Sequence, residues 1–185
     1  MQRVFYSGFL QILEYKEGAG TPLRIMRKRT REIAMELLYQ STMNHKMPEE
    51  LMDDYFEDNQ DDLREDTDMD YLEDVLTGVE SHKEQIDRII EKYLVKWKLP
   101  RISKINLSIL RLATYEILFI ENIPNNVSIF EAVDMTKKYS DDTSGSFVNG
   151  VLDKIAHMET RNSMESVPEN EIMEDPETEE ELDEQ

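Results

Sequence analysis

The 185-residue chain contains no cysteine and has a formal net charge of −20 at pH 7, with 41 acidic residues against 21 lysines and arginines. The lack of cysteine excludes disulfides, thiolate metal sites and cysteine nucleophiles. No apolar run approaches the roughly 18 to 20 residues that a membrane-spanning helix needs. The length suits one sizeable core, so a single cytoplasmic domain with tails is expected.

The first 25 residues are predicted to be an extension outside the folded domain. Their sequence GAGTP, at residues 18–22, is turn-prone and separates a short apolar stretch from the basic sequence RKRTR at residues 27–31. Met26 directly precedes the basic run. We therefore hypothesise that Met26 is the natural start and that residues 1–25 are an extension or a mis-assigned start.

Apolar residues at helical spacing follow from there to about residue 158. The acidic stretch at residues 59–68 is expected to be a connection, and the sequence SDDTSG before Phe147 a loop. Nothing alternates with period two for long enough to make a strand. These patterns predict an all-α domain of six or seven helices over residues 26–160. The expected helices cover residues 27–42, 48–58, 69–97 with a bend near Gly78 or Ser81, 103–121, 128–139 with a capping box of Ser128 and Glu131, and 147–158.

Residues 161–185 are predicted to form a disordered acidic tail. From Glu159 to Gln185, 12 acidic residues stand against one basic residue, Arg161. Such a composition cannot repay the entropy of ordering. Two roles stay open for the tail: a solvating end, or an electrostatic competitor for a basic site.

No catalytic or metal site is predicted. His45, His82 and His157 are isolated in the sequence, and the acidic pairs fall in expected loops or on solvent faces. The sequence SGSFVNG at residues 144–150 lacks the preceding strand and the following lysine of a phosphate-binding loop. We expect no enzyme activity, no cofactor and no metal.

The basic run at residues 27–31 is the first candidate binding site. Cations are disfavoured at a helix N-terminus by the backbone dipole, so either solubility or binding must account for them. At 100° per residue, Lys28 and Tyr39 lie within about 20° of each other, opposite the apolar face. A cation and an aromatic on one outward stripe suit RNA, because phosphates meet lysine and unstacked bases meet aromatic rings.

The last predicted helix is the second candidate. Phe147 lies about 40° from Val151 and so at the border of the buried stripe, which leaves open a core role or a binding role. Gly150 costs roughly 1 kcal/mol relative to alanine in a helix interior. Close approach of another helix or of a ligand backbone would offset that cost.

Four stretches stand out along the chain: RKRTREIAMELLYQ (27–40), SILRLATYEILF (108–119), IPNNVSIFEAV (123–133) and FVNGVLDKIA (147–156). In this order and at this spacing they resemble the NusB family of transcription antitermination proteins. The resemblance covers about residues 27–158 and implies an all-helical protein of two subdomains without catalytic activity. It also implies pairing with the ribosomal small-subunit protein NusE, binding of the single-stranded boxA element of nascent ribosomal RNA, and a place in a complex on RNA polymerase.

The resemblance also assigns residue roles by position. Asn106 and Leu107 fall where relatives commonly carry a charged pair that faces NusE, which makes them the candidate partner-binding residues. Phe130 replaces a usual asparagine, and Ser146 stands where relatives often have a cation. The implied RNA-binding residues are Arg27, Lys28, Arg29 and Arg31 for phosphates, and Tyr39 and Phe147 for bases.

Two other classes of protein were weighed against this one. The first is a helical protein-interaction adaptor, with a homodimer among its forms and with weak or no RNA binding, and it is favoured by Ser146 and the acidic tail. An RNA-modifying enzyme is excluded by length, because no residues remain for a cofactor-binding domain. Salt dependence separates the first two readings, since affinity that rests on phosphate contacts falls steeply with salt.

Overall fold

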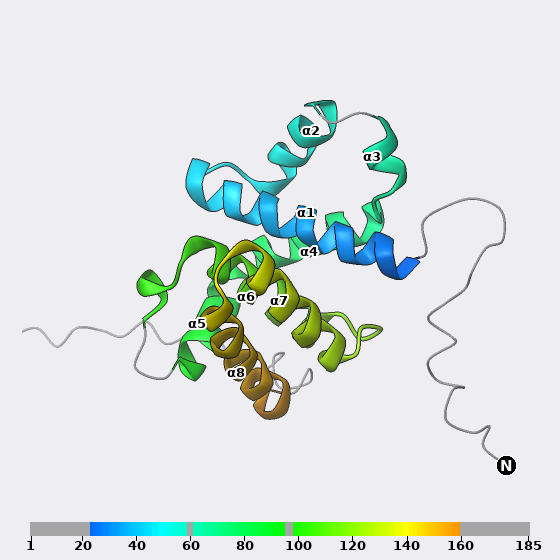
Figure 1. Ribbon diagram of the computed structural model, residues 1–185. Helices are drawn as coiled ribbons and strands as arrows, with labels where there is room; N and C mark the ends of the chain where they lie inside the picture. The colour runs from blue at the N-terminus through cyan, green and yellow to red at the C-terminus, as the bar shows by residue number, and fades with distance from the viewer. Residues whose placement is uncertain (1–22, 59–60, 95–97, 160–185) are drawn as a thin grey trace, which may run out of the picture.

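The computed structural model describes residues 23–58, 61–94 and 98–159. In these ranges the chain forms eight α-helices and one 3₁₀ turn and no strand, which confirms the all-α prediction (Figure 1). Of the extension predicted over residues 1–25, residues 1–22 lie outside the described residues, as does the acidic tail, whereas residues 23–25 form the beginning of α1. The helices are α1 (Leu23–Asn44), α2 (Pro48–Asp58), α3 (Asp61–Glu65), α4 (Met69–Ser81), α5 (Lys83–Tyr93), α6 (Lys104–Phe119), α7 (Asn125–Tyr139) and α8 (Asp142–Met158), with the 3₁₀ turn at Leu99–Arg101.

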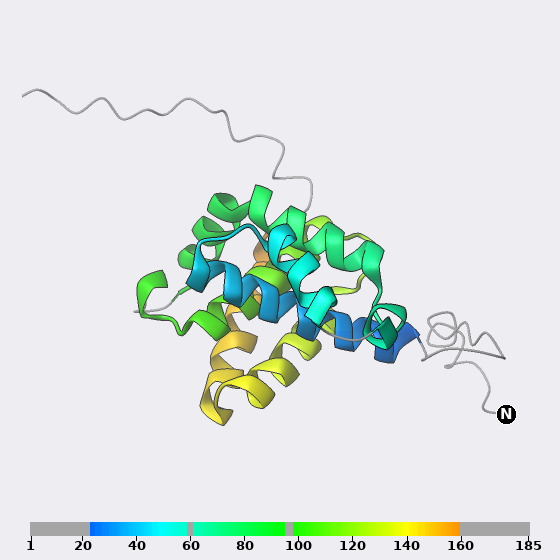
Figure 2. The same cartoon turned by 90° about the horizontal axis from the view of Figure 1, so that it is seen from above.

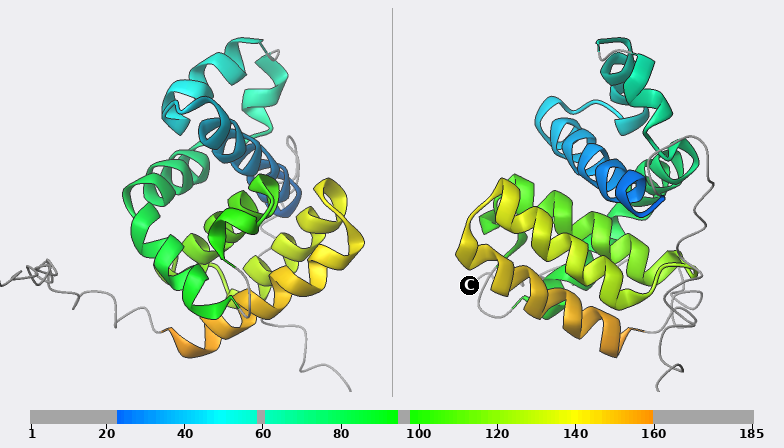
Figure 3. Two further views of the ribbon diagram at one scale, coloured as in Figure 1. Left: turned by 90° about the vertical axis from the view of Figure 1, so that its left-hand side faces the viewer. Right: turned by 45° about the vertical axis from the view of Figure 1, so that its right-hand side comes forward.

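The helices gather into two groups around α6. In the first group α1 packs on α2, α4 and α6, and seen from above α2 and α3 lie over α1 and α4 (Figure 2). In the second group α6 contacts α5, α7 and α8, and α7 and α8 form an antiparallel pair (Figure 3). The most apolar segment of the sequence thus forms the central helix, α6. A helix that is apolar on all sides is buried, because neighbouring helices must cover each of its faces.

The long pattern predicted over residues 69–97 is two helices that meet at His82. The Ser81 hydroxyl donates to the carbonyl oxygens of Thr77, at 2.8 Å, and Gly78, at 3.2 Å, and a ring nitrogen of His82 lies 2.9 Å from the Gly78 carbonyl. Side chains that bond to backbone carbonyls in this way compete with the helix ladder. The expected bend near Ser81 is therefore a helix boundary.

Gly78 sets how closely α4 and α6 approach. A Cβ atom at this position would overlap the ring of Tyr115, which lies on α6. Tyr115 is itself held by Asp74, whose carboxylate accepts from its hydroxyl at 3.2 Å, and it stacks on Phe119 with ring centroids 5.1 Å apart. The absence of a side chain at residue 78 therefore makes room for this tyrosine.

The predicted capping box of α7 was wrong. The helix begins at Asn125, directly after Pro124, so that Ser128 and Glu131 lie inside it and are buried. The Ser128 hydroxyl and one oxygen of Glu131 meet no hydrogen-bond partner among the described residues. Proline at the N-cap begins the helix one turn earlier, because its fixed φ suits a helix start.

The start of α8 also differs from the prediction, since residues 142–146 are helical. The Asp141 carboxylate accepts from the backbone N–H groups of Thr143 and Ser144, both at 2.9 Å. These bonds satisfy two of the N–H groups that a helix start leaves unpaired, which is what an aspartate N-cap does. The loop predicted before Phe147 is thus the first turn of α8.

Candidate nucleic-acid interface

Arg27 and Arg31 form the inward half of the basic run. They are four residues apart in α1 and so share a face, which points to α4 and α6. Arg27 pairs with Asp68, the N-cap of α4, with its Nη2 atom 2.6 Å from Oδ2, and its guanidinium lies 4.3 Å from the centre of the Tyr71 ring. Arg27 is therefore half-buried and already holds a carboxylate.

Arg31 is more deeply placed, with only 4% of its surface exposed. Its Nε atom donates to Glu116 Oε1 on α6 at 2.8 Å, and the Tyr71 hydroxyl donates to the same oxygen. Burial alone would lower the pKa of Arg31, but Tyr71 and Glu116 raise it above its ordinary value. The guanidinium thus joins α1 to α6 inside the protein and has no open path to a phosphate.

Lys28 and Arg29 form the outward half of the run. Lys28 Nζ lies 2.6 Å from Asp134 Oδ2 on α7, and this hydrogen bond raises the pKa of the lysine. The two side chains are 44% and 43% exposed, and a pair in that setting contributes little to stability. A phosphate can therefore replace Asp134 at small cost. Arg29 is exposed.

The stretch of α1 between Lys28 and Tyr39 meets α2 and α7 through two glutamates. Glu32 accepts from Lys138 Nζ at 2.8 Å and from the Tyr139 hydroxyl at 3.1 Å, both on α7. Glu36 accepts from the Tyr55 hydroxyl on α2 at 3.2 Å.

Burial, followed by Glu36, raises the pKa of Tyr55 to about 12, so this hydroxyl stays a donor at neutral pH. Tyr39 is half-buried near the end of this face.

Sequence reasoning missed Lys138 and Tyr139 as members of this surface. The Lys138 ammonium lies 4.8 Å from the centre of the Tyr139 ring, a cation and an aromatic in contact. Lysines in the last turn of a helix are common, because they interact favourably with the negative end of the helix dipole. The sequence KKY at residues 137–139 therefore gave no sign of a binding role. Only the side-chain contacts between α7 and α1 give these residues a place next to the basic run.

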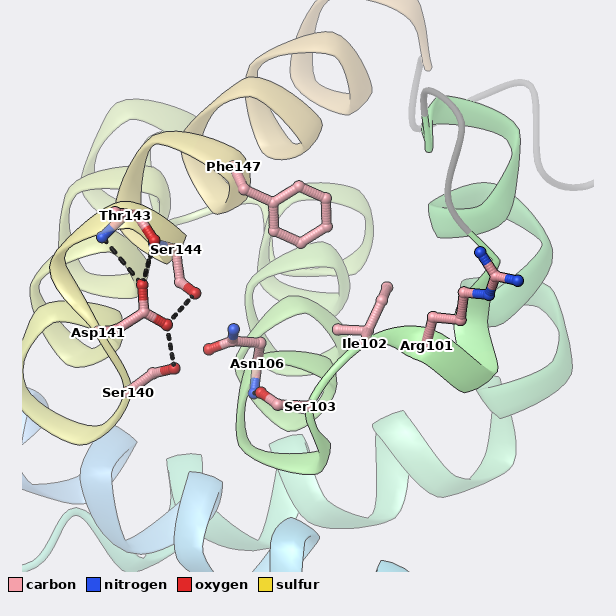
Figure 4. Close-up of a pocket in the computed structure, with 9 residues that line it drawn as sticks. All are labelled: Arg101, Ile102, Ser103, Asn106, Ser140, Asp141, Thr143, Ser144 and Phe147. Carbon is pink, nitrogen blue, oxygen red and sulfur yellow. Dashed lines mark hydrogen bonds between the residues drawn. The ribbon is translucent and has the colours of Figure 1, made fainter.

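Phe147 lies in a hollow of about 390 Å³ between the beginnings of α6 and α8 (Figure 4). Phe147 is half-buried and packs against the core, and the rest of its ring faces the hollow. Its position is therefore compatible with both the core role and the binding role. Ser103 and Asp141, the N-caps of α6 and α8, face the hollow, and Arg101 stands at its edge. A guanidinium and an aromatic ring are partners that a nucleotide uses, whereas the backbone N–H groups at these two helix starts are already bonded to Ser103 and Asp141.

Asn106 lines the same hollow and is only 6% exposed. Its Oδ1 atom meets no hydrogen-bond donor among the described residues. Leu107, the second residue expected to bind the partner protein, is buried in the core. Leu107 could therefore influence a partner only by shaping the beginning of α6, whereas Asn106 shares a wall of the hollow with Phe147.

Gly150 faces open space on α8. No atom of the described residues comes within 4 Å of the position that its Cβ would take, and the residue is exposed. Close packing of another described helix is therefore not the reason for this glycine. The approach of a ligand backbone remains the prediction.

The α1–α7 surface and the Phe147 hollow are neighbours along the chain. Tyr139 ends α7, and Ser140 and Asp141 follow it directly and line the hollow. Within the described ranges, no helix is long and apolar enough to cross a membrane, and no group of three histidine or acidic side chains is placed to hold a metal.

The described residues form an all-α domain with lysine and tyrosine side chains on its outer face and a hollow beside Phe147, which is a helical domain with a candidate binding surface. Comparisons with known proteins give the same picture. The model of the NusB family matches residues 28–157. The chain is 50% identical over 129 residues to the transcription antitermination protein NusB of Clostridium perfringens, which covers 70% of this chain and 95% of the relative. The NusB of Clostridium novyi is 48% identical over 126 residues, covering 68% and 94%.

Solved structures agree with the sequence relatives. A structure of T. maritima NusB matches with a TM-score of 0.65 and 33% identity, covering 78% of this chain and 97% of that one. A structure described as antitermination factors NusB and NusE in complex with dsRNA matches with a TM-score of 0.62 and 30% identity, covering 71% and 96%. This chain belongs to the NusB family.

Proposed function

We propose that this chain is a transcription antitermination factor that binds the boxA element of nascent ribosomal RNA together with NusE and joins a complex on RNA polymerase. The proposal contains no catalytic step. Its main support is the pair of outward cations, Lys28 and Arg29, on a chain whose NusB relatives are named antitermination proteins. A solved structure of similar fold, described as NusB and NusE in complex with dsRNA, supports the choice of RNA and NusE as partners.

In this proposal the RNA strand follows the surface described above. Lys28 and Arg29 bind phosphates, and Tyr39 and Phe147 stack on bases. Arg27 and Arg31 support the surface from beneath, because their guanidinium groups are held by Asp68 and Glu116. The NusE contact is assigned to the beginning of α6, where Asn106 and Leu107 lie.

The alternative is a protein-interaction adaptor with weak or no RNA binding. One observation favours it: two of the four cations of the basic run are consumed by internal ion pairs. Fewer phosphate contacts mean weaker binding and a shallower dependence on salt.

Replacing both Lys28 and Arg29 with alanine tests the proposal. We expect weaker binding of a boxA-like RNA and a salt slope that is flatter by about one unit or somewhat more. Arg88→Ala, which removes an exposed cation from α5, is the matched control and should change neither. Unchanged RNA binding in the double variant would mean that the basic end only solubilises the helix.

Phe147→Ala tests the hollow. We expect a loss of roughly 1 to 3 kcal/mol of binding free energy if the ring stacks on a base. Since Phe147 also packs against the core, the thermal unfolding of the variant must be measured alongside. A large loss of stability in Phe147→Ala, with RNA binding retained at low temperature, would assign the ring to the core alone.

A further inference from the structure

Phe130 is a large aromatic side chain that the fold leaves outside. It is 60% exposed on α7, while Ala132 and Met135 of the same helix are buried in the core. At 100° per residue, Lys137 lies about 20° and Asp134 about 40° around the helix from Phe130. The outward face of α7 therefore carries an aromatic ring and a lysine in one line, with the carboxylate of Asp134 held by Lys28.

The ion pairs between α1 and α7 fix what lies beside Phe130. Lys28 meets Asp134, and four residues further along both helices Glu32 meets Lys138. The two helices thus run in the same direction, as Figure 1 shows. One turn earlier, Phe130 comes level with Arg24, which is exposed. Lys28, one turn further along α1, and Lys137, two turns further along α7, are cations on this side of Phe130.

We propose that Phe130 is a second base-stacking residue, which binds one base of single-stranded RNA while Lys28 and Lys137 contact the neighbouring phosphates. The inference rests on the proposed RNA-binding function and extends the RNA path to the N-terminal end of α1. Phe130 and Tyr139 are nine residues apart, or about 13 Å along the helix axis. Separate nucleotides therefore occupy the two ends of α7.

Charge and shape favour RNA over a protein partner on this face. Apolar protein interfaces need a continuous patch, with charged residues depleted at its centre. Two exposed apolar residues of α1, Leu23 and Ile25, lie about 140° and 60° around that helix from Lys28, so neither shares its line. An aromatic ring beside cations is the arrangement that binds single-stranded nucleic acid.

The test is the affinity of the full chain for a boxA-like single-stranded RNA, measured by fluorescence anisotropy over a range of salt. Phe130→Ala should weaken binding about fivefold or more, because one stacked base is lost. The salt slope should stay unchanged, because phenylalanine releases no counterions. Phe130→Trp should keep the wild-type affinity, whereas Lys137→Ala should flatten the slope by about one unit.

Met158→Ala is the matched control, since it removes an exposed apolar side chain from the far end of α8 and should leave binding unchanged. Thermal unfolding of Phe130→Ala should match the wild type, as the ring is outside the core. The inference is overturned if Phe130→Ala binds RNA like Met158→Ala, or if it alters only self-association in sedimentation. Loss of binding in Phe147→Ala but not in Phe130→Ala would remove this inference alone, while a wild type that ignores RNA would remove the proposed function as well.

Discussion

At the residue scale, helical geometry divides one basic run into two pairs with different tasks. Arg27 and Arg31 face inward and meet carboxylates of α4 and α6, whereas Lys28 and Arg29 face outward. An arginine is suited to the buried position, because its planar fork satisfies several acceptors at once. The inner pair fixes the helix that presents the outer pair.

Arg31→Ala tests the division. Removing one partner of a buried pair leaves Glu116 charged and uncompensated inside the protein, so we expect a loss of about 3 to 5 kcal/mol in the free energy of unfolding. Arg29→Ala, at an exposed position, should stay within about 0.5 kcal/mol of the wild type. Chemical denaturation measures both. An Arg31→Ala protein of normal stability that has lost RNA binding would place Arg31 on the RNA instead.

The sequence alone does not distinguish the buried cations of the basic run from the exposed ones, because their partners lie far away along the chain. The outward position of Lys28 follows from helical spacing alone. Arg31 is held in the interior by Glu116, 85 positions away, and Arg27 is paired with Asp68, 41 positions away. Lys138 and Tyr139 were missed for the same reason, since their partner Glu32 lies more than 100 positions earlier.

At the element scale, two glycines in helices show opposite reasons for lacking a side chain. Gly78 faces the Tyr115 ring at the contact of α4 with α6, and Gly150 faces open space on α8. Local pattern predicted that both helices exist, because their apolar spacing is strong. It could not separate the two glycines, since the difference lies in what packs opposite each.

Gly78→Ala and Gly150→Ala form a matched pair of variants. Overpacking against Tyr115 should cost Gly78→Ala about 1 to 3 kcal/mol of stability. Gly150→Ala should gain up to about 1 kcal/mol, because alanine is the better helix former and meets no neighbour. Denaturant unfolding compares them. If a ligand backbone approaches α8 here, Gly150→Ala will be the more stable protein and the weaker RNA binder; equal destabilisation of both variants would contradict the packing described.

The start of α8 makes a prediction about pH. Hydrogen bonds from Ser144 and Thr143 hold the pKa of Asp141 well below its usual range. A carboxylate whose folded pKa is depressed stabilises the fold above its unfolded pKa, and the contribution is lost as the pH falls through the folded pKa. The advantage of the wild type over Asp141→Asn in melting temperature should therefore shrink as the pH falls below about 4. A difference that is constant from pH 7 to pH 3 would show that the charge of Asp141 has no part in the cap.

Helix boundaries were the part of the fold that the sequence predicted least well. The helix predicted over residues 69–97 ends and restarts at His82, and α7 begins at Asn125 rather than at the predicted capping box. Both errors arose where two local signals competed. Proline at residue 124 overrode the Ser128 and Glu131 spacing, and Ser81 bonds to the backbone of the helix that it ends.

At the scale of the whole molecule, the distribution of charge matters more than its sum. A net charge of −20 argues against nucleic acid, yet 12 of the acidic residues fall between Glu159 and Gln185. The outward side of α1 and α7 carries Lys28 and Lys138, paired with Asp134 and Glu32, together with the exposed Lys137, and Arg29 is exposed elsewhere on α1. A ligand with phosphates responds to that local field, which is screened beyond about 10 Å at 0.1 M salt.

The central claim is that RNA and NusE bind this chain together. The most direct measurement is fluorescence anisotropy of a boxA-like single-stranded RNA against the full chain, with and without NusE, at two salt concentrations. The account predicts binding that NusE strengthens and that falls steeply with salt, as phosphate contacts require. Binding of NusE without any contribution from the RNA would contradict it and would identify the chain as a protein-interaction adaptor.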